Sequence, residues 1–123
     1  MLTFKQYITT SLLVEEKIDN FVNFALDHLK LQNIPKINLV QIRDNNMTTA
    51  NYCPNSKSIK VYTKGRAIFD IARSIAHELA HHHQLENGQE LDGTTGSECE
   101  NEANALAGKL IRMYGEKNPD FYE

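Results

Sequence analysis

Long apolar runs, cysteine pairs and an excess of basic side chains are all missing from this 123-residue chain. No stretch reaches the roughly 18 consecutive apolar residues that predict a transmembrane helix, and Thr9, Thr10 and Ser11 interrupt the apolar segment 8–14. That segment also lacks the basic leader and the small-residue cleavage site of a secretory signal. We therefore expect a cytoplasmic protein without a membrane partner.

The chain has two cysteines, Cys53 and Cys99, and neither has the CxxC spacing of a metal or redox motif. Two cysteines do not make a disulfide framework, so we expect free thiols. Because Cys99 adjoins an acidic residue, a thiolate ligand or a redox role stays open. Its position on the helical wheel points inward, which favours simple packing.

The net charge is −3 and the isoelectric point is near 5.9, so a broad basic surface that could neutralise phosphates is not expected. Nucleic acid is therefore not an expected partner. With 123 residues, 41% of them hydrophobic, the chain is large enough to bury around two-thirds of its unfolded surface in one core. We expect a single domain over residues 1–123.

Hydrophobic spacing predicts three helices and three short strands, which is an α+β fold. The first helix is expected over residues 14–29, before Pro35 prevents its continuation. A second helix covers residues 66–86, and a third begins near Ser97, a plausible N-cap. Strands are expected at 37–42, 48–53 and 58–62, with turn-forming residues at 54–57 between the last two.

The most informative segment is His77-Glu78-Leu79-Ala80-His81, in the second predicted helix. His77 and His81 lie one helical turn apart, about 6 Å along the axis, so both imidazoles can bind one metal ion. Glu78 projects about 100° away from His77, where it could act as general base for a water at the metal. The opposite face of this helix carries an apolar stripe, formed by Ile68, Ile71, Ala72, Ile75 and Leu79.

A catalytic zinc ion needs three protein ligands and one open position, so a third ligand should follow downstream. Three glutamates of the third helix compete for this role: Glu98, Glu100 and Glu102. Measured from the inward apolar face, Glu100 lies at about 50°, Glu102 at about 110° and Glu98 at about 150°. The wheel predicts Glu100 as the ligand, whereas Glu98 and Glu102 fit an acidic first turn that favours the helix dipole.

The motif at 77–81 and the run from Glu100 to Met113 together resemble the small gluzincin metallopeptidases, especially the ImmA/IrrE-like group. That group has an HELxH helix, a loop and a helix of the pattern ExxA followed by Asn or Asp. The resemblance covers about residues 49–113. It implies that zinc binds to His77, His81 and Glu100, and that Asn104 orients a zinc-bound histidine.

The same resemblance implies a minimal zincin domain, with about three helices packed on a small three-stranded sheet. It further implies an enzyme that hydrolyses peptide bonds, with Glu78 as the catalytic base and a peptide or protein as substrate. One strand edge is expected to pair with the extended substrate. Tyr52, Tyr62 and Tyr114 are candidates for an additional donor to the oxyanion, and the sequence does not choose among them.

Alternatives remain at this stage. The protein could bind zinc without proteolysis, or it could be a regulatory protease that acts only with one partner. The oligomeric state is open. His82 and His83 extend the histidine run, but adjacent helical residues diverge by about 100°, so neither can share an ion with His81. His82 projects with the apolar stripe and is expected to be a hydrogen-bonded structural histidine.

Overall fold

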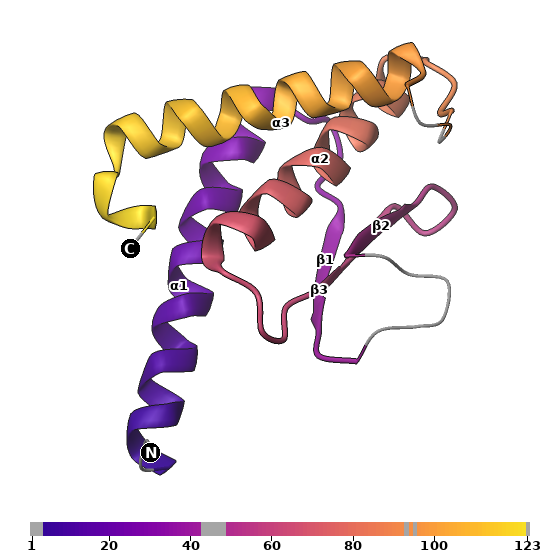
Figure 1. Ribbon diagram of the computed structural model, residues 1–123. Coiled ribbons are helices and arrows are strands. Elements are labelled where there is room, and N and C mark those ends of the chain that lie inside the picture. Colours follow the sequence, from indigo (N-terminus) through magenta and orange to yellow (C-terminus); the bar gives the residue numbers. More distant parts are fainter. Residues whose placement is uncertain (1–3, 43–48, 93, 95, 123) are drawn as a thin grey trace.

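The computed structural model describes residues 4–42, 49–92, 94 and 96–122 and has three helices and a three-stranded mixed sheet (Figure 1). The predicted α+β fold is therefore confirmed. The elements are α1 (Phe4–Leu29), β1 (Lys36–Val40), β2 (Ala50–Cys53), β3 (Ser58–Tyr62), α2 (Ile68–Glu86), α3 (Glu98–Lys117) and the 3₁₀ helix η1 (Pro119–Tyr122). Within the described ranges, no helix combines the length and apolar character needed to cross a membrane.

The strand order in the sheet is β1-β3-β2, with β1 parallel and β2 antiparallel to the central β3. The predicted turn at 54–57 joins β2 to β3, and its last residue, Lys57, has a positive φ of 50°. β2 has a neighbour on one side only in the described part of the chain, so its other edge is open. This open edge is a consequence of the strand order.

Both ends of β1 differ from the prediction, since the strand covers Lys36–Val40 rather than residues 37–42, and β2 begins at Ala50, after Thr49. β1 ends at Val40, not at Ile42, because its partner strand β3 ends at Tyr62. The backbone bond from Thr63 N to Val40 O (3.0 Å) closes this end of the pairing. Ile42 is instead 81% exposed. In the second strand, Ala50–Cys53 is extended as expected, and Thr48 lies outside the described residues.

Helix α2 is the centre of the fold. It packs against α1, α3 and the sheet, and Figure 1 shows it between α1 and the strands. Its apolar stripe, apart from the partly buried Ile68, is buried in one core with Phe21 of α1 and with Ile59 and Val61 of β3. Since this packing fixes the rotation of α2, it also fixes the direction in which the histidines on the other face point.

Helix α1 begins at Phe4, well before the predicted start at Val14. No Pro or Gly lies between these residues, and Thr and Ser lower helix propensity only modestly, so the helix continues through them. At its other end, Lys30 adopts a left-handed φ of 52° while its N–H still bonds to Leu26 O (3.0 Å). This residue ends the helix before Pro35 is reached.

The 3₁₀ helix η1 was not predicted. Its Phe121 is buried and stacks on Phe21, with ring centroids 5.7 Å apart, and meets Tyr114 edge-on at 4.9 Å. The segment after α3 therefore folds back onto α1. A single aromatic residue after a Pro gives no periodic pattern, which is why the sequence did not reveal this contact.

Candidate metal centre

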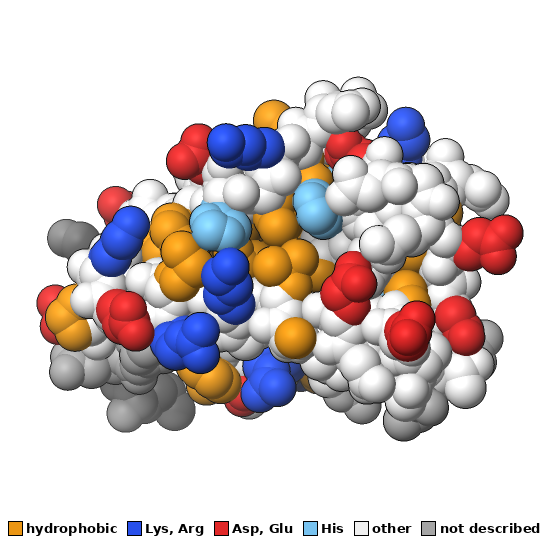
Figure 2. Space-filling model, turned by 90° about the horizontal axis from the view of Figure 1, so that it is seen from above, with side chains coloured by type: hydrophobic (Ala, Val, Ile, Leu, Met, Phe, Trp, Pro, Cys, Tyr) orange, Lys and Arg blue, Asp and Glu red, His pale blue; other side chains and the backbone are white. Residues whose placement is uncertain are grey.

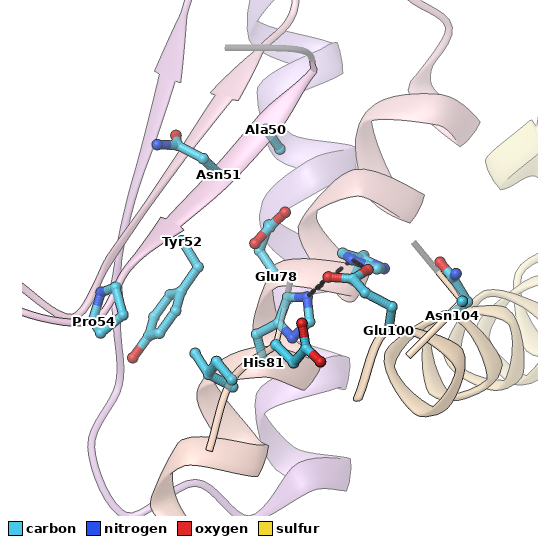
Figure 3. A pocket seen from close by; sticks show the side chains of 12 residues that line it. Ala50, Asn51, Tyr52, Pro54, Glu78, His81, Glu100 and Asn104 are labelled. Carbon is cyan, nitrogen blue, oxygen red and sulfur yellow. Dashed lines mark hydrogen bonds and ion pairs between the residues drawn. The ribbon is translucent and has the colours of Figure 1, made fainter. Parts of the chain in front are cut away.

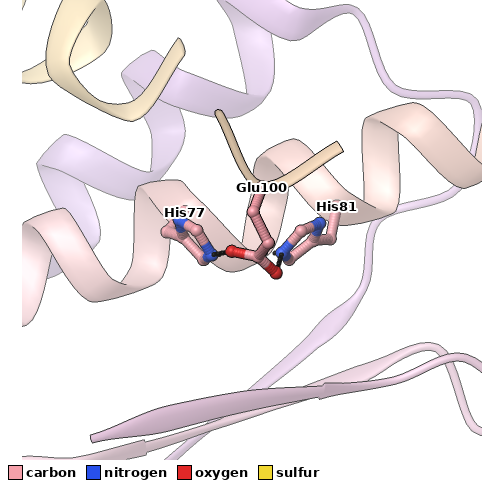
Figure 4. Close-up of side chains that lie close together, drawn as sticks. All are labelled: His77, His81 and Glu100. Carbon is pink, nitrogen blue, oxygen red and sulfur yellow. Dashed lines mark hydrogen bonds and ion pairs between the residues drawn. The ribbon is translucent and has the colours of Figure 1, made fainter. Parts of the chain in front are cut away.

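Three side chains from two helices meet above the sheet. His77 Nε2 lies 3.0 Å from Glu100 Oε2, and His81 Nε2 lies 3.1 Å from Glu100 Oε1 (Figure 4). The two Nε2 atoms are 3.1 Å apart. In the described part of the chain, His77, His81 and Glu100 form the one group of His, Cys, Asp or Glu that could hold a metal ion, with ligand atoms within 4.8 Å of one another.

The sequence predicted that these three side chains lie close together, and the local structure explains why they do. His77 and His81 are one turn apart on α2, and Glu100 is in the first turn of α3. Ser97 caps α3, as predicted: its Oγ accepts from Glu100 N (3.1 Å) and donates to Asp92 O (2.9 Å). The cap thus fixes the start of α3 at the turn from which Glu100 reaches the histidines.

The donor set fits zinc. Two imidazole nitrogens and one carboxylate oxygen are the ligands of many catalytic zinc sites, with bonds of about 2.0–2.2 Å. Two corners of a tetrahedron with bonds of about 2.0 Å lie roughly 3.3 Å apart by the same geometry. The observed separation of 3.1 Å between the two Nε2 atoms is close to that edge. The site can therefore hold a metal ion of this size without a large rearrangement.

The two competing glutamates lie elsewhere. Glu98 is exposed in the first turn of α3, as the dipole interpretation expected. Glu102 is not part of the cluster with the two histidines and accepts a hydrogen bond from Gln84 Nε2 (3.2 Å). Glu100 is thus the glutamate of α3 that the structure brings to both histidines.

Glu78 is buried beside the three candidate ligands but is not part of their cluster. Its side chain points into the cavity between α2 and β2 (Figure 3), and the residue is 8% exposed. The pKa of Glu78 is raised to about 7, mainly by burial, with His81 acting to lower it and Glu100 acting to raise it. A carboxyl group with a pKa near neutrality can both accept and return a proton at physiological pH.

His77 has its pKa lowered, first by burial and then by the neighbouring His81, while Glu100 and Asn104 act in the opposite direction. A lower pKa keeps the imidazole neutral, which is the form that binds a metal. The opposing effect of Asn104 comes from a side-chain hydrogen bond to His77. Asn104 therefore touches a candidate ligand, as the sequence pattern implied.

A cavity of about 560 Å³ opens over these residues, and Figure 3 shows its lining. One wall is the edge strand β2, with Ala50, Asn51 and Tyr52, and the other is formed by His77, Glu78, His81, Glu100 and Asn104. A second hollow of about 490 Å³ shares Ala50, His77, Glu78 and Asn104 with it and continues to Arg66 and Arg73. The two hollows place the candidate metal ligands along a groove rather than at the bottom of a closed pit.

The hydrogen-bond pattern of β2 leaves backbone groups facing this groove. Tyr62 N donates to Thr49 O (2.9 Å), so these two residues form a hydrogen-bonded pair of the antiparallel ladder. Ala50 and Tyr52 then occupy the alternate positions, and their N–H and C=O groups point away from β3. These groups are the ones that an additional strand would use.

The three tyrosines that were candidate donors to the oxyanion have different positions in the structure. Tyr114 is buried among Phe21, Phe24 and Phe121, remote from the cavity lining. Tyr52 lines the cavity, but its hydroxyl lies 2.7 Å from His82 Nδ1. Tyr62 belongs to the central strand β3 and lines neither hollow.

His82 is buried and hydrogen-bonded, as predicted. Its Nε2 lies 2.7 Å from Asn33 O and 2.8 Å from Glu86 Oε1, both of which are acceptors. Nε2 therefore carries a hydrogen, and Nδ1 forms a hydrogen bond with the Tyr52 hydroxyl. This network anchors β2 to α2 just behind the cavity.

Sequence reasoning missed one residue at the site. Gln84 is buried, and its Oε1 lies 2.9 Å from His81 Nδ1. Its position three residues after His81 on the same helix was the available signal. Cys99, expected to pack inward as a free thiol, is unpaired and half-buried, with its Sγ 3.0 Å from Gln84 Oε1.

Comparisons of the chain with models of known protein families, with curated proteins and with solved structures gave no match in any of the three. A functional assignment therefore depends on the geometry of the site and on the motifs quoted above.

Proposed function

We propose that this protein is a zinc-dependent metallopeptidase of the gluzincin type, similar to the ImmA/IrrE-like group. The observation that carries the proposal is the position of Glu78. It lies in the same cavity as the cluster of His77, His81 and Glu100 but is not part of that cluster. Holding a metal does not require this carboxylate, whereas hydrolysis by an activated water requires a base.

In this proposal His77, His81 and Glu100 hold the zinc ion, which would supply Lewis-acid chemistry by acidifying a water molecule and polarising a carbonyl group. Glu78 takes the proton of the attacking water and delivers it to the leaving amine. In the metal-free protein the pKa of Glu78 is raised to about 7, which supports a role of this carboxyl group in proton transfer. Asn104 holds the imidazole of His77 in place.

The proposed substrate is an extended peptide or protein segment that adds to the open edge of β2. The outward backbone groups of Ala50 and Tyr52 support this mode of binding, since peptides often bind by extending a sheet. On the face seen in Figure 2, basic and acidic side chains are interspersed, which agrees with a peptide rather than a nucleic acid as partner. The free thiols of Cys53 and Cys99 are compatible with a reducing compartment, so we place the activity in the cytoplasm.

The test compares wild type with Glu78→Gln and Glu98→Gln on unfolded proteins and a peptide library, after zinc content has been measured for each. Glu78→Gln should retain zinc and fold, while cleavage falls by about 100-fold or more, because a general base has been removed. Glu98→Gln, which alters an exposed carboxylate on α3, should behave as wild type.

Two results would contradict the proposal. A wild-type protein that takes up no transition metal has no hydrolytic centre of this kind. A wild-type protein that binds zinc but cleaves nothing, and binds its partners as tightly as Glu78→Gln does, would instead be a zinc-binding or partner-dependent regulatory protein.

A further inference from the structure

Gln84 has every polar atom of its side chain engaged. It is 1% exposed, and its Nε2 donates to Cys99 O (3.0 Å) and to Glu102 Oε1 (3.2 Å), both on α3. Its Oε1 lies 2.9 Å from His81 Nδ1 and 3.0 Å from Cys99 Sγ. One amide group therefore joins a candidate metal ligand on α2 to the first turn of α3.

The partners of Gln84 fix the orientation of its amide. A backbone carbonyl and a carboxylate oxygen can only accept, so the group that faces them must be the NH₂ group. If the amide were rotated, its oxygen would face Cys99 O and Glu102 Oε1, and neither of these acceptors would receive a hydrogen from Gln84. Oε1 must therefore face His81 and Cys99, from which it accepts.

This orientation determines the tautomer of His81. An amide oxygen accepts and cannot donate, so the hydrogen between it and His81 must be on Nδ1. In a neutral imidazole the lone pair is then on Nε2, the atom that lies 3.1 Å from both Glu100 Oε1 and His77 Nε2. His81 Nε2, His77 Nε2 and Glu100 Oε1 are thus three electron-rich atoms in contact, and a cation bound between them would stabilise this arrangement.

We propose that Gln84 is a positioning residue of the metal centre. It holds His81 as the Nδ1–H tautomer, with the Nε2 lone pair aimed at the metal. Through Cys99 O and Glu102 it also ties down the turn of α3 that carries Glu100. This inference rests on the metal site proposed above and is independent of whether peptides are cleaved.

The first test reads the tautomer directly. In metal-free wild type at about pH 8, the nitrogen chemical shifts of His81 should report hydrogen on Nδ1 and a bare Nε2. Gln84→Met keeps the length and apolar volume of the side chain but removes all four contacts, so the Nδ1–H preference should be lost. Finding hydrogen on Nε2 of wild-type His81 would overturn the proposal.

The second test measures zinc affinity by competition with a chelator. Gln84→Met should weaken zinc binding by about 10- to 100-fold, as is usual when the hydrogen-bond partner of a metal-binding histidine is removed. Gln89→Met makes the same chemical change at an exposed glutamine and should leave affinity unchanged. Equal affinity for wild type and a folded Gln84→Met would also overturn the proposal, whereas a wild type that binds no zinc would refute the metal site itself.

Exchanging the residue types at positions 84 and 102 tests whether Gln84 acts through its hydrogen bonds or only by filling space. Gln84→Glu alone retains an acceptor for His81 but places a carboxylate against Glu102, so affinity should stay low. Adding Glu102→Gln restores a donor at that contact but not at Cys99 O, so the double variant should recover part of the affinity that Gln84→Glu loses. If Gln84→Met does not fold, this pair decides the matter, because failure of the double variant to recover would count against the proposal.

Discussion

At the residue scale, three glutamates of α3 that look alike in sequence have three different environments. Glu100 contacts both histidines, Glu102 accepts from Gln84, and Glu98 is exposed. Helical geometry alone separated Glu100 from the others, because a 100° step converts residue number into direction. Gln84 was missed because the same wheel gives a direction but not the hydrogen-bond partner that a side chain meets there.

Glu100→Gln should therefore remove most of the zinc, since an amide oxygen is a much weaker zinc ligand than a carboxylate. Glu98→Gln makes the same change at an exposed residue two positions earlier on α3 and should keep about one zinc per chain. Elemental analysis after zinc reconstitution and dialysis gives the answer. Full zinc content in the Glu100 variant would show that the third ligand is another residue.

Glu78 should make the metal-free protein less stable as the pH rises. Its folded pKa of about 7 lies above the ordinary value of 4.5, so the folded state holds a proton that the unfolded state has lost. Stability due to this group is complete below about pH 4.5 and declines up to about pH 7. At about 1.4 kcal/mol per pKa unit, the decline approaches roughly 3 kcal/mol.

The measurement is urea unfolding in the presence of a chelator, for wild type and Glu78→Gln, across pH 5 to 8. His77 has a lowered pKa and contributes a change of the opposite sign, and His81 and Glu100 also face the group. The difference between the two proteins isolates Glu78, and the variant should gain stability relative to wild type as the pH rises. A difference that does not vary with pH would mean that Glu78 is ionised in the folded protein.

At the scale of elements, the start of α3 matters more to the site than its length. Ser97 accepts from Glu100 N and donates to Asp92 O, so one hydroxyl joins the preceding loop to the ligand-bearing turn. The two helices that carry the candidate ligands, α2 and α3, could be predicted from the sequence because their apolar faces repeat over several turns. Strand boundaries were less accurate, since they depend on where a partner strand ends, as at Val40 and Tyr62.

Ser97→Ala should lower the free energy of unfolding by about 1 kcal/mol, the usual cost of losing an N-cap. It should also weaken zinc binding, because the turn that carries Glu100 loses its anchor. Ser97→Thr keeps the hydroxyl and serves as the matched control. Denaturant titration and chelator competition on both variants test the two effects, and zinc affinity unaffected by Ser97→Ala would separate the cap from the site.

At the scale of the whole molecule, the site lies where α2, α3 and the edge of the sheet meet, while a cluster of aromatic side chains lies at the other end of α3. Phe21, Tyr114 and Phe121 join α1, α3 and η1. The α+β class and the central helix were predictable from periodicity. The return of the chain at η1 was not, because a contact between residues 21 and 121 leaves no local signal.

Phe121→Ala should destabilise the protein by about 3 kcal/mol, since it opens a cavity among buried rings. Phe69→Ala is the comparison, because Phe69 is 36% exposed and its removal should cost less. Zinc affinity of the folded Phe121 variant should equal that of wild type, given the distance along α3 between the two regions. A large loss of affinity would instead reveal coupling through α3.

The open edge of β2 has a further consequence. Its four residues, Ala50–Cys53, carry no charged side chain, and charges are a common means of keeping strand edges of different molecules apart. An edge that binds the proposed peptide substrate would also bind the edge of another copy of the chain. Concentrated protein should therefore self-associate through β2, and a bound peptide should keep it monomeric by occupying the same row of backbone hydrogen bonds.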